Sequence, residues 1–165
     1  MNRYDNLYYK EKAVITYIIS EGKILLIEKL RGLGAGKINV PGGHIEPGES
    51  AMEAAIRETE EEVSLSTSKL KLVGFLFFEF TNGLTMKGSV FKTSNYTGIM
   101  ANSPEAIPFW CDLDKIPYKK MWEDDLIWLP EMLKGRYFRG FFRFNEDSMI
   151  SRKIEFYDDS RDFNP

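Results

Sequence analysis

The chain has 165 residues, 43% hydrophobic and 14% aromatic, which predicts one folded domain over residues 1–165 and excludes a disordered protein. Its 22 basic and 25 acidic residues give a net charge of −3, which argues against a general nucleic-acid-binding protein. One cysteine, Cys111, and one histidine, His44, exclude an internal disulfide, a thiolate zinc cluster and any two-histidine metal site. Apolar runs are too short to span a membrane and no signal-peptide core precedes them, so a cytoplasmic protein is expected.

Apolar patterning and turn residues predict seven strands. In chain order these strands cover 13–19, 24–28, 70–80, 87–96, 108–113, 137–145 and 149–157. Glycines cluster after the second strand, at 32–36 and at 42–43, which predicts a loop lining a site.

Two helices are predicted among these strands. The clearer one covers 51–63, where Ser50 and Glu53 form a capping box. The other covers 122–134, and Pro130 should kink it or mark its boundary. Strands and helices mixed in this order predict an α+β fold with a mixed sheet.

Glutamates are concentrated around the first predicted helix. Seven lie between positions 46 and 62, against one basic residue, Arg57. Glu58, Glu61 and Glu62 share a helix face, where like charges cost about 0.2–0.5 kcal/mol per pair. A hard divalent cation such as Mg²⁺ would offset this repulsion, and Arg57 could pair with a carboxylate or bind a phosphate. The alternative interpretation is a solvated acidic face.

The segment from 43 to 65 resembles the Nudix box, G-x5-E-x7-R-E-U-x-E-E-x-G-U, in which U is apolar. It reads Gly43-x5-Glu49-x7-Arg57-Glu58-Thr59-x-Glu61-Glu62-x-Ser64-Leu65. Thr59 replaces an apolar residue, and Ser64 replaces a glycine. That glycine position favours a left-handed turn after the helix, which costs another residue about 1 kcal/mol. Both departures concern packing and capping rather than the charged positions.

The resemblance implies the Nudix fold, a mixed β-sheet in an α/β/α sandwich, and attack of water on a nucleoside diphosphate derivative. It implies a divalent cofactor, Mg²⁺ with Mn²⁺ as an alternative, which would neutralise the phosphate charge. Carried over to this chain, Arg57 would orient a carboxylate. The implied catalytic metal ligands are the Gly42 carbonyl and the carboxylates of Glu58, Glu61, Glu62 and Glu105. The resemblance also allows Glu105 to act as a base, and its alternative interpretation is an exposed loop acid. His44 is interpreted as an ordinary polar loop residue.

Other segments resemble the MutT-homologue branch of this family, the oxidised-purine nucleoside triphosphatases. They cover 29–39, 78–80, 116–125 and 140–144, within a similarity that extends from about 13 to 157. The resemblance implies a purine stacked on Trp122, which is worth about 1–3 kcal/mol. The other implied substrate-binding residues are Asn39, Asp124 and Asp125 on the hydrogen-bonding edge of the base, Phe78, Met86 and Trp128 as apolar walls, and Lys29 in the adjoining loop.

Asp124 and Asp125 would be adjacent carboxylates in a partly dry pocket. Such a pair resists ionising together, so one member should keep its proton and the two should titrate as a unit. The pair has another interpretation, because aspartate is also a favoured cap at a helix start. Trp122 and Trp128 could likewise be ordinary core residues.

The leading hypothesis is a Mg²⁺-dependent pyrophosphohydrolase that converts oxidised purine nucleoside triphosphates to monophosphates and pyrophosphate, and so cleanses the nucleotide pool. Its expected partner is a small nucleotide, without nucleic acid or membrane, and a monomer is expected with a dimer as the alternative. Leu33 and Val40-Pro41 depart from the branch, so 8-oxo-dGTP and 2-hydroxy-dATP both remain candidates. The alternatives are a Nudix hydrolase of ADP-ribose or a dinucleoside polyphosphate, and a non-catalytic nucleotide sensor.

Overall fold

The computed structural model describes residues 8–163 and contains eleven strands and three α-helices in that range. The strands are β1 (Glu11–Ser20), β2 (Lys23–Lys29), β3 (Ile38–Asn39), β4 (Gly42–His44), β5 (Ser66–Ser68), β6 (Lys71–Phe80), β7 (Thr85–Thr93), β8 (Asn95–Thr97), β9 (Ala106–Asp112), β10 (Tyr137–Asn145) and β11 (Ser148–Tyr157). The helices are α1 (Ala51–Val63), α2 (Asp125–Leu133) and α3 (Ser160–Phe163), with 3₁₀ turns at Leu113–Lys115 and Tyr118–Lys120.

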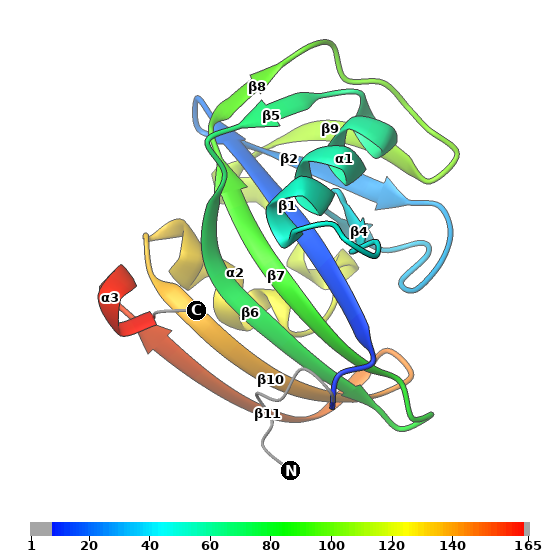
Figure 1. The fold of residues 1–165 in the computed structure, drawn as a ribbon, viewed down its shortest axis with the longest axis vertical. Coiled ribbons are helices and arrows are strands. Elements are labelled where there is room, and N and C mark those ends of the chain that lie inside the picture. The colour runs from blue at the N-terminus through cyan, green and yellow to red at the C-terminus, as the bar shows by residue number, and fades with distance from the viewer. Residues whose placement is uncertain (1–7, 164–165) are drawn as a thin grey trace.

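A nine-stranded mixed sheet forms the centre of the molecule (Figure 1). Its order is β11-β10-β6-β7-β1-β2-β3, with β4 also paired to β1 and β9 to β2. β1 pairs with β7, and β10 with β6, in parallel. β1 contacts β2 only near their shared turn, and its first half pairs with β4 instead. The sheet therefore opens between β1 and β2. β5 and β8 form a separate two-stranded sheet.

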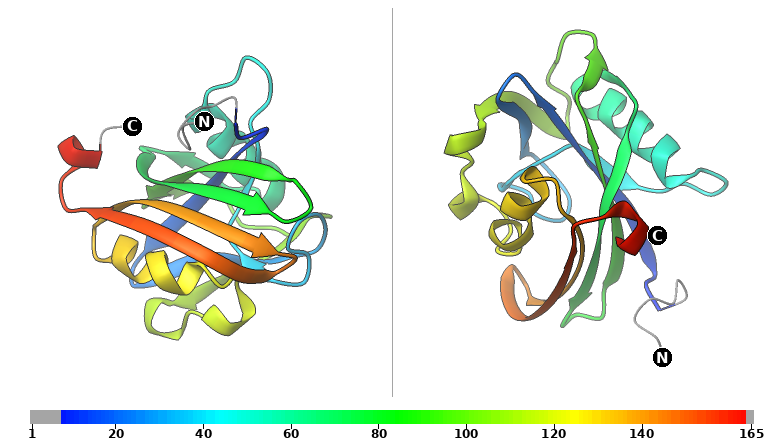
Figure 2. Two further views of the ribbon diagram at one scale, coloured as in Figure 1. Left: turned by 90° about the horizontal axis from the view of Figure 1, so that it is seen from below. Right: turned by 90° about the vertical axis from the view of Figure 1, so that its left-hand side faces the viewer.

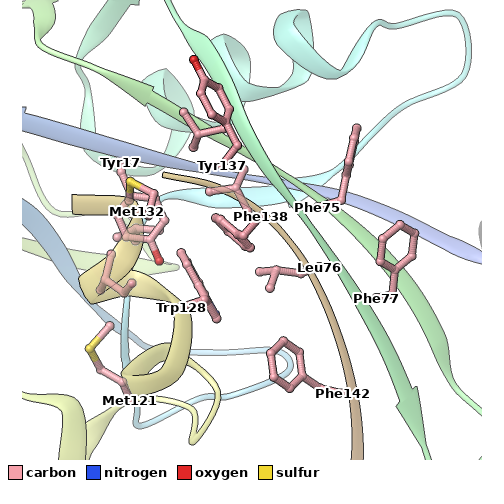
Figure 3. Close-up of a cluster of buried hydrophobic side chains, with 14 of the residues drawn as sticks. Tyr17, Phe75, Leu76, Phe77, Met121, Trp128, Met132, Tyr137, Phe138 and Phe142 are labelled. Atoms are coloured by element: carbon pink, nitrogen blue, oxygen red, sulfur yellow. The ribbon is translucent and has the colours of Figure 1, made fainter. Parts of the chain in front are cut away.

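Helices cover both faces of the large sheet. The right-hand view of Figure 2 shows α1 and α2 on opposite sides of it. On the α1 side, Ala54 and Ala55 pack with Val14 and Phe91. On the α2 side, Trp128 points towards the sheet and stacks on Phe138 with ring centroids 4.7 Å apart (Figure 3). The expected α+β fold with a mixed sheet is confirmed, and strands such as β1 are apolar because both faces are buried.

The local signals of α1 are all present. The Ser50 hydroxyl accepts the N–H of Glu53 at 3.1 Å, and the Glu53 carboxylate accepts the N–H of Ser50 at 2.8 Å. The helix ends at Ser64, which adopts the left-handed conformation with φ 63°. Thr59 is buried, and its hydroxyl donates to the Ala55 carbonyl at 2.8 Å. The helix thus tolerates both departures from the box.

Two predicted elements differ from the structure by more than a shift of one or two residues at an end. The strand predicted at 87–96 is two strands, β7 and β8, because the Thr93 hydroxyl donates to the Ser68 carbonyl and accepts the N–H of Asn95, which turns the chain. The second helix begins at Asp125 rather than at 122, and it continues through Pro130 for three more residues. Within the described range, no helix has the length and apolar character needed to cross a membrane.

Candidate active site

A cavity of about 580 Å³ lies where β1 and β2 diverge. The second half of α1, the loop after β2 and the segment before α2 contribute to its wall. Every site residue predicted from the sequence lines this cavity except Trp128. The lining includes Lys29, Asn39, Gly42, Arg57, Glu58, Glu61, Glu62, Phe78, Met86, Glu105, Trp122, Asp124 and Asp125. Residues that are up to 96 positions apart therefore surround one space.

Arg57 connects the carboxylates of the first helix. Its guanidinium donates twice to Glu49, at 2.7 and 2.9 Å, and once to Glu58, at 2.8 Å. It also donates to Glu61 at 3.2 Å and to the carbonyl of His44 at 3.0 Å. These five bonds use all five of its donors. Of the two roles considered for Arg57, the structure favours orienting carboxylates over binding a phosphate.

Three carboxylates form a candidate metal centre beside Arg57. Oxygens of Glu58, Glu62 and Glu105 lie within 4.8 Å of one another. Burial, together with the charges of Glu58 and Glu105, raises the pKa of Glu62 to about 8. Burial also raises the pKa of Glu58, although Arg57 opposes the shift. Three carboxylates that gather this closely offer the oxygen ligands that a hard divalent ion such as Mg²⁺ or Mn²⁺ prefers.

One buried oxygen in this centre also supports the binding of a divalent ion. Oε2 of Glu62 accepts no hydrogen bond from the residues described here. The backbone N–H of Gly42 donates to the Glu62 carboxylate, which fixes its position. Gly43 allows Glu58 to approach, because a Cβ at Gly43 would collide with the Glu58 carboxyl group. The glycine of the box therefore serves the carboxylates directly.

Glu61 was expected among the metal ligands, and Glu105 had the alternative of an exposed loop acid; the structure places both differently. The Glu61 side chain is 60% exposed and lies outside the cluster of three, although it lines the cavity. Glu105 belongs to the cluster, so it is more than an isolated loop acid. It also forms an ion pair with Arg31 at 2.8 Å.

Trp122 also lines the cavity, and its ring is held by aromatic neighbours. It makes edge contacts with Phe144 and Phe80, at centroid distances of 5.2 and 6.1 Å. The Lys37 ammonium lies 5.2 Å from the Trp122 ring centroid and 3.4 Å from the Asp147 carboxylate. This cation–π contact and ion pair tie the glycine-rich loop to the β10–β11 turn.

Asp124 and Asp125 are only 2% and 5% exposed, yet both line the cavity. The Trp128 indole N–H donates to Oδ2 of Asp124 at 2.9 Å. Burial raises the pKa of Asp124 to about 6, and burial together with the charge of Asp124 raises the pKa of Asp125 well above its ordinary value. Asp124 makes no side-chain capping bond at the start of α2, so the capping interpretation fails for this residue.

Trp128 does not lie where the sequence analysis predicts it. It was expected in the wall of the pocket, but it is fully buried and absent from the cavity lining. Its indole supports Asp124 from behind, because positions 124 and 128 are one helical turn apart. The sequence interpretation also missed Tyr17, whose ring meets Trp128 edge-on at 5.6 Å. It missed Lys37 too, although a basic residue at the end of a glycine-rich loop is a signal of a possible site residue.

Comparisons with known proteins agree with this geometry. The model of the NUDIX domain family matches residues 10–132. An oxidized purine nucleoside triphosphate hydrolase from Danio rerio is 37% identical over 155 residues, which cover 93% of this chain and 99% of the relative. A protein of the same name from Mus musculus is 34% identical, covering 85% and 91%. The crystal structure of the MutT protein from Bacillus halodurans has the same fold, with a TM-score of 0.78 and 24% identity over 88% of this chain and 97% of that one.

Proposed function

The chain belongs to the Nudix family, and on this premise we propose that it hydrolyses oxidised purine nucleoside triphosphates to monophosphates and pyrophosphate with the help of Mg²⁺ or Mn²⁺. The fish and mouse relatives are named oxidized purine nucleoside triphosphate hydrolases, which supports this substrate class. The observation that carries the proposal is the buried Asp124–Asp125 pair in the wall of the cavity that also holds the three-carboxylate centre. In this proposal the cell uses the enzyme to remove damaged nucleotides before they reach DNA.

The carboxylate end would act on the phosphates. Glu58, Glu62 and Glu105 would hold the divalent ion, with Glu61 and the Gly42 carbonyl as further ligands. When bound, that ion supplies charge neutralisation for the phosphates and activates the attacking water. Arg57 keeps the Glu58 carboxylate in a fixed orientation through its 2.8 Å bond.

The other end would select the base. Trp122 offers a stacking surface between apolar walls that include Phe78 and Met86. The indole bond to Asp124 favours its ionised form, so the shared proton belongs on Asp125. An acceptor carboxylate and a donor carboxyl side by side can bind a purine edge that presents a donor next to an acceptor.

A pyrophosphate-release assay with Mg²⁺ tests the proposal. The substrates are 8-oxo-dGTP, 2-hydroxy-dATP, dGTP, dATP, ADP-ribose and a dinucleoside polyphosphate. We expect an oxidised purine triphosphate to be preferred, the preference to be lost in Trp122→Ala, and turnover to be lost in Glu62→Gln. Equal turnover of dGTP and 8-oxo-dGTP, or preference for ADP-ribose, would discard the base assignment. Nucleotide binding without turnover of any substrate would overturn the assignment as an enzyme.

A further inference from the structure

The phosphate chain of a nucleotide needs cationic partners, and the structure limits the candidates. Within residues 8–163, the lysine and arginine side chains that line the cavity are Lys29, Arg31 and Arg57. Arg57 has no free donor, since all five of its N–H groups bond to the protein. Lys29 attracts the Glu62 carboxylate and so belongs to the floor of the metal centre.

Arg31 is the remaining cation, and it is differently placed. Its side chain is 63% exposed and makes a single ion pair in the described part of the chain, from Nη2 to Oε1 of Glu105 at 2.8 Å. Four of its five donors are therefore available at the cavity. The backbones that carry the two partners are joined, because the Leu30 N–H donates to the Glu105 carbonyl at 2.9 Å. Arg31 can change partner by rotating its side chain alone.

Glu105 is shared between two competing uses. It pairs with Arg31, and its carboxylate oxygens also lie within 4.8 Å of those of Glu58 and Glu62. A divalent ion held by this cluster would attract the Glu105 carboxylate and so weaken its ion pair with the Arg31 guanidinium. The phosphate oxygens that accompany the ion would then approach Arg31 from the cavity. An exposed ion pair is weak, whereas a guanidinium binds phosphate through two parallel bonds, so the exchange is favourable.

We propose that Arg31 exchanges partners when a nucleotide binds: its guanidinium leaves Glu105 and binds the phosphate chain, and Glu105 is released to the metal centre. This inference rests on the proposed function, since it places the phosphates over the three carboxylates. Arg31 becomes a substrate-binding residue in the loaded protein and a counter-ion of the metal centre in the free protein.

Calorimetric binding to three probes tests the inference in the presence of Mg²⁺. The probes are inorganic tripolyphosphate, 8-oxo-2′-deoxyguanosine and its non-hydrolysable α,β-imido triphosphate. We expect Arg31→Ala to weaken the binding of both phosphate probes about tenfold and to leave nucleoside binding unchanged. Arg31→Lys should recover only part of the loss, because an ammonium cannot bind bidentately. Lys23→Ala is the matched control, since Lys23 forms an exposed 2.7 Å pair with Asp112 outside the cavity lining.

A thermal double-mutant cycle of Arg31→Ala and Glu105→Gln tests the exchange itself. We expect the two changes to be non-additive in the free protein and additive in protein saturated with Mg²⁺ and the imido triphosphate. Non-additivity that persists in the loaded protein would overturn the exchange, and unchanged tripolyphosphate binding by Arg31→Ala would overturn the phosphate role. If Arg31 governs tripolyphosphate binding but the protein shows no preference for oxidised purines, the proposed function fails and this inference stands.

Discussion

The two ends of the cavity neutralise adjacent carboxylates by different means. At the metal end, Glu49 and Glu58 share the guanidinium of Arg57, whose hydrogen bonds lower the pKa of Glu49 to about 2. At the base end, Asp124 and Asp125 are more deeply buried, and an uncharged indole N–H from Trp128 donates to Asp124. The guanidinium of Arg57 keeps Glu49 charged, whereas burial without a cationic partner favours a retained proton on Asp125. Under the proposed function, the same side-chain chemistry would serve as a cation site in one place and as a neutral donor in the other.

The largest effect should come from breaking the metal end. Glu62→Gln keeps the shape of the side chain but removes the charge of the buried ligand, so we expect kcat to fall about a thousandfold. Steady-state assays of pyrophosphate release measure this change in kcat. Glu60→Gln, on an exposed position of the same helix, is the matched control and should keep nearly full activity. Comparable activity in the two variants would contradict the assignment of the centre.

Arg57 should not be replaceable by lysine. Its bonds to Glu49 and Glu58 depend on the planar arrangement of its donors, which an ammonium cannot reproduce. We expect Arg57→Lys to lower kcat about tenfold to a hundredfold and to lower the Tm by about 5 °C. Activity assays and thermal melts of the same preparation check this. A variant with normal kcat would show that carboxylate orientation is unimportant.

The base end should become more stable when its charge is removed. Because the pKa of Asp124 is raised from 3.8 to about 6, the folded protein binds more protons than the unfolded chain, and stability falls as pH rises from about 4 through 6. At pH 8 this cost is on the order of 2–3 kcal/mol. We expect Asp124→Asn combined with Asp125→Asn to raise the Tm by roughly 5–10 °C at pH 8 and by little at pH 4.

Melts between pH 4 and 8 in EDTA compare this double variant with the wild type. The metal-centre carboxylates are present in both proteins, so their titration cancels in the difference. A difference in Tm that does not grow with pH would contradict the retained proton. The same variant should lose its discrimination between 8-oxo-dGTP and dGTP, since it can no longer present an ionised acceptor beside a donor.

The smallest effect is expected at the outer face of Trp122. Lys37→Ala removes a cation–π contact and an exposed ion pair, which together contribute about 1 kcal/mol. We expect KM for the oxidised purine to rise about twofold to fivefold while kcat stays constant. Asp147→Ala should do less, because it leaves the cation–π contact in place. A change in kcat rather than KM would show that the loop contributes to the reaction itself.

Local spacing predicted those parts of the site that one helix supplies. Glu58 and Glu62 are four residues apart, so the periodicity of a helix is enough to place them together. The contact between Asp124 and Trp128 has the same spacing and could have been found in the same way. Glu105 is 43 residues beyond Glu62, and only its attachment to β9 beside β2 brings it to the cluster.

Burial accounts for most of what spacing could not predict. The raised pKa of Asp125 requires its complete removal from water, which depends on α2 packing against the sheet. Trp128 was placed in the pocket wall by the resemblance to the MutT-homologue branch, and its burial in the core was the alternative interpretation. The break between β7 and β8 depends on one hydroxyl, that of Thr93, which bonds to Ser68 on a distant strand.

The parallel pairing of β10 with β6 has a consequence for how the protein is made. The base end relies on Phe142 and Phe144 of β10, which contact Phe78 with ring centroids 6.0 Å apart in each case. The match to the family ends at residue 132, before this strand begins. On the ribosome, the segments of the metal centre emerge as soon as β9 has been synthesised, whereas the wall behind the base must wait for the last hairpin. In the proposed assignment, the segments that would hold the phosphates are therefore synthesised before the strand that supports the base-binding wall.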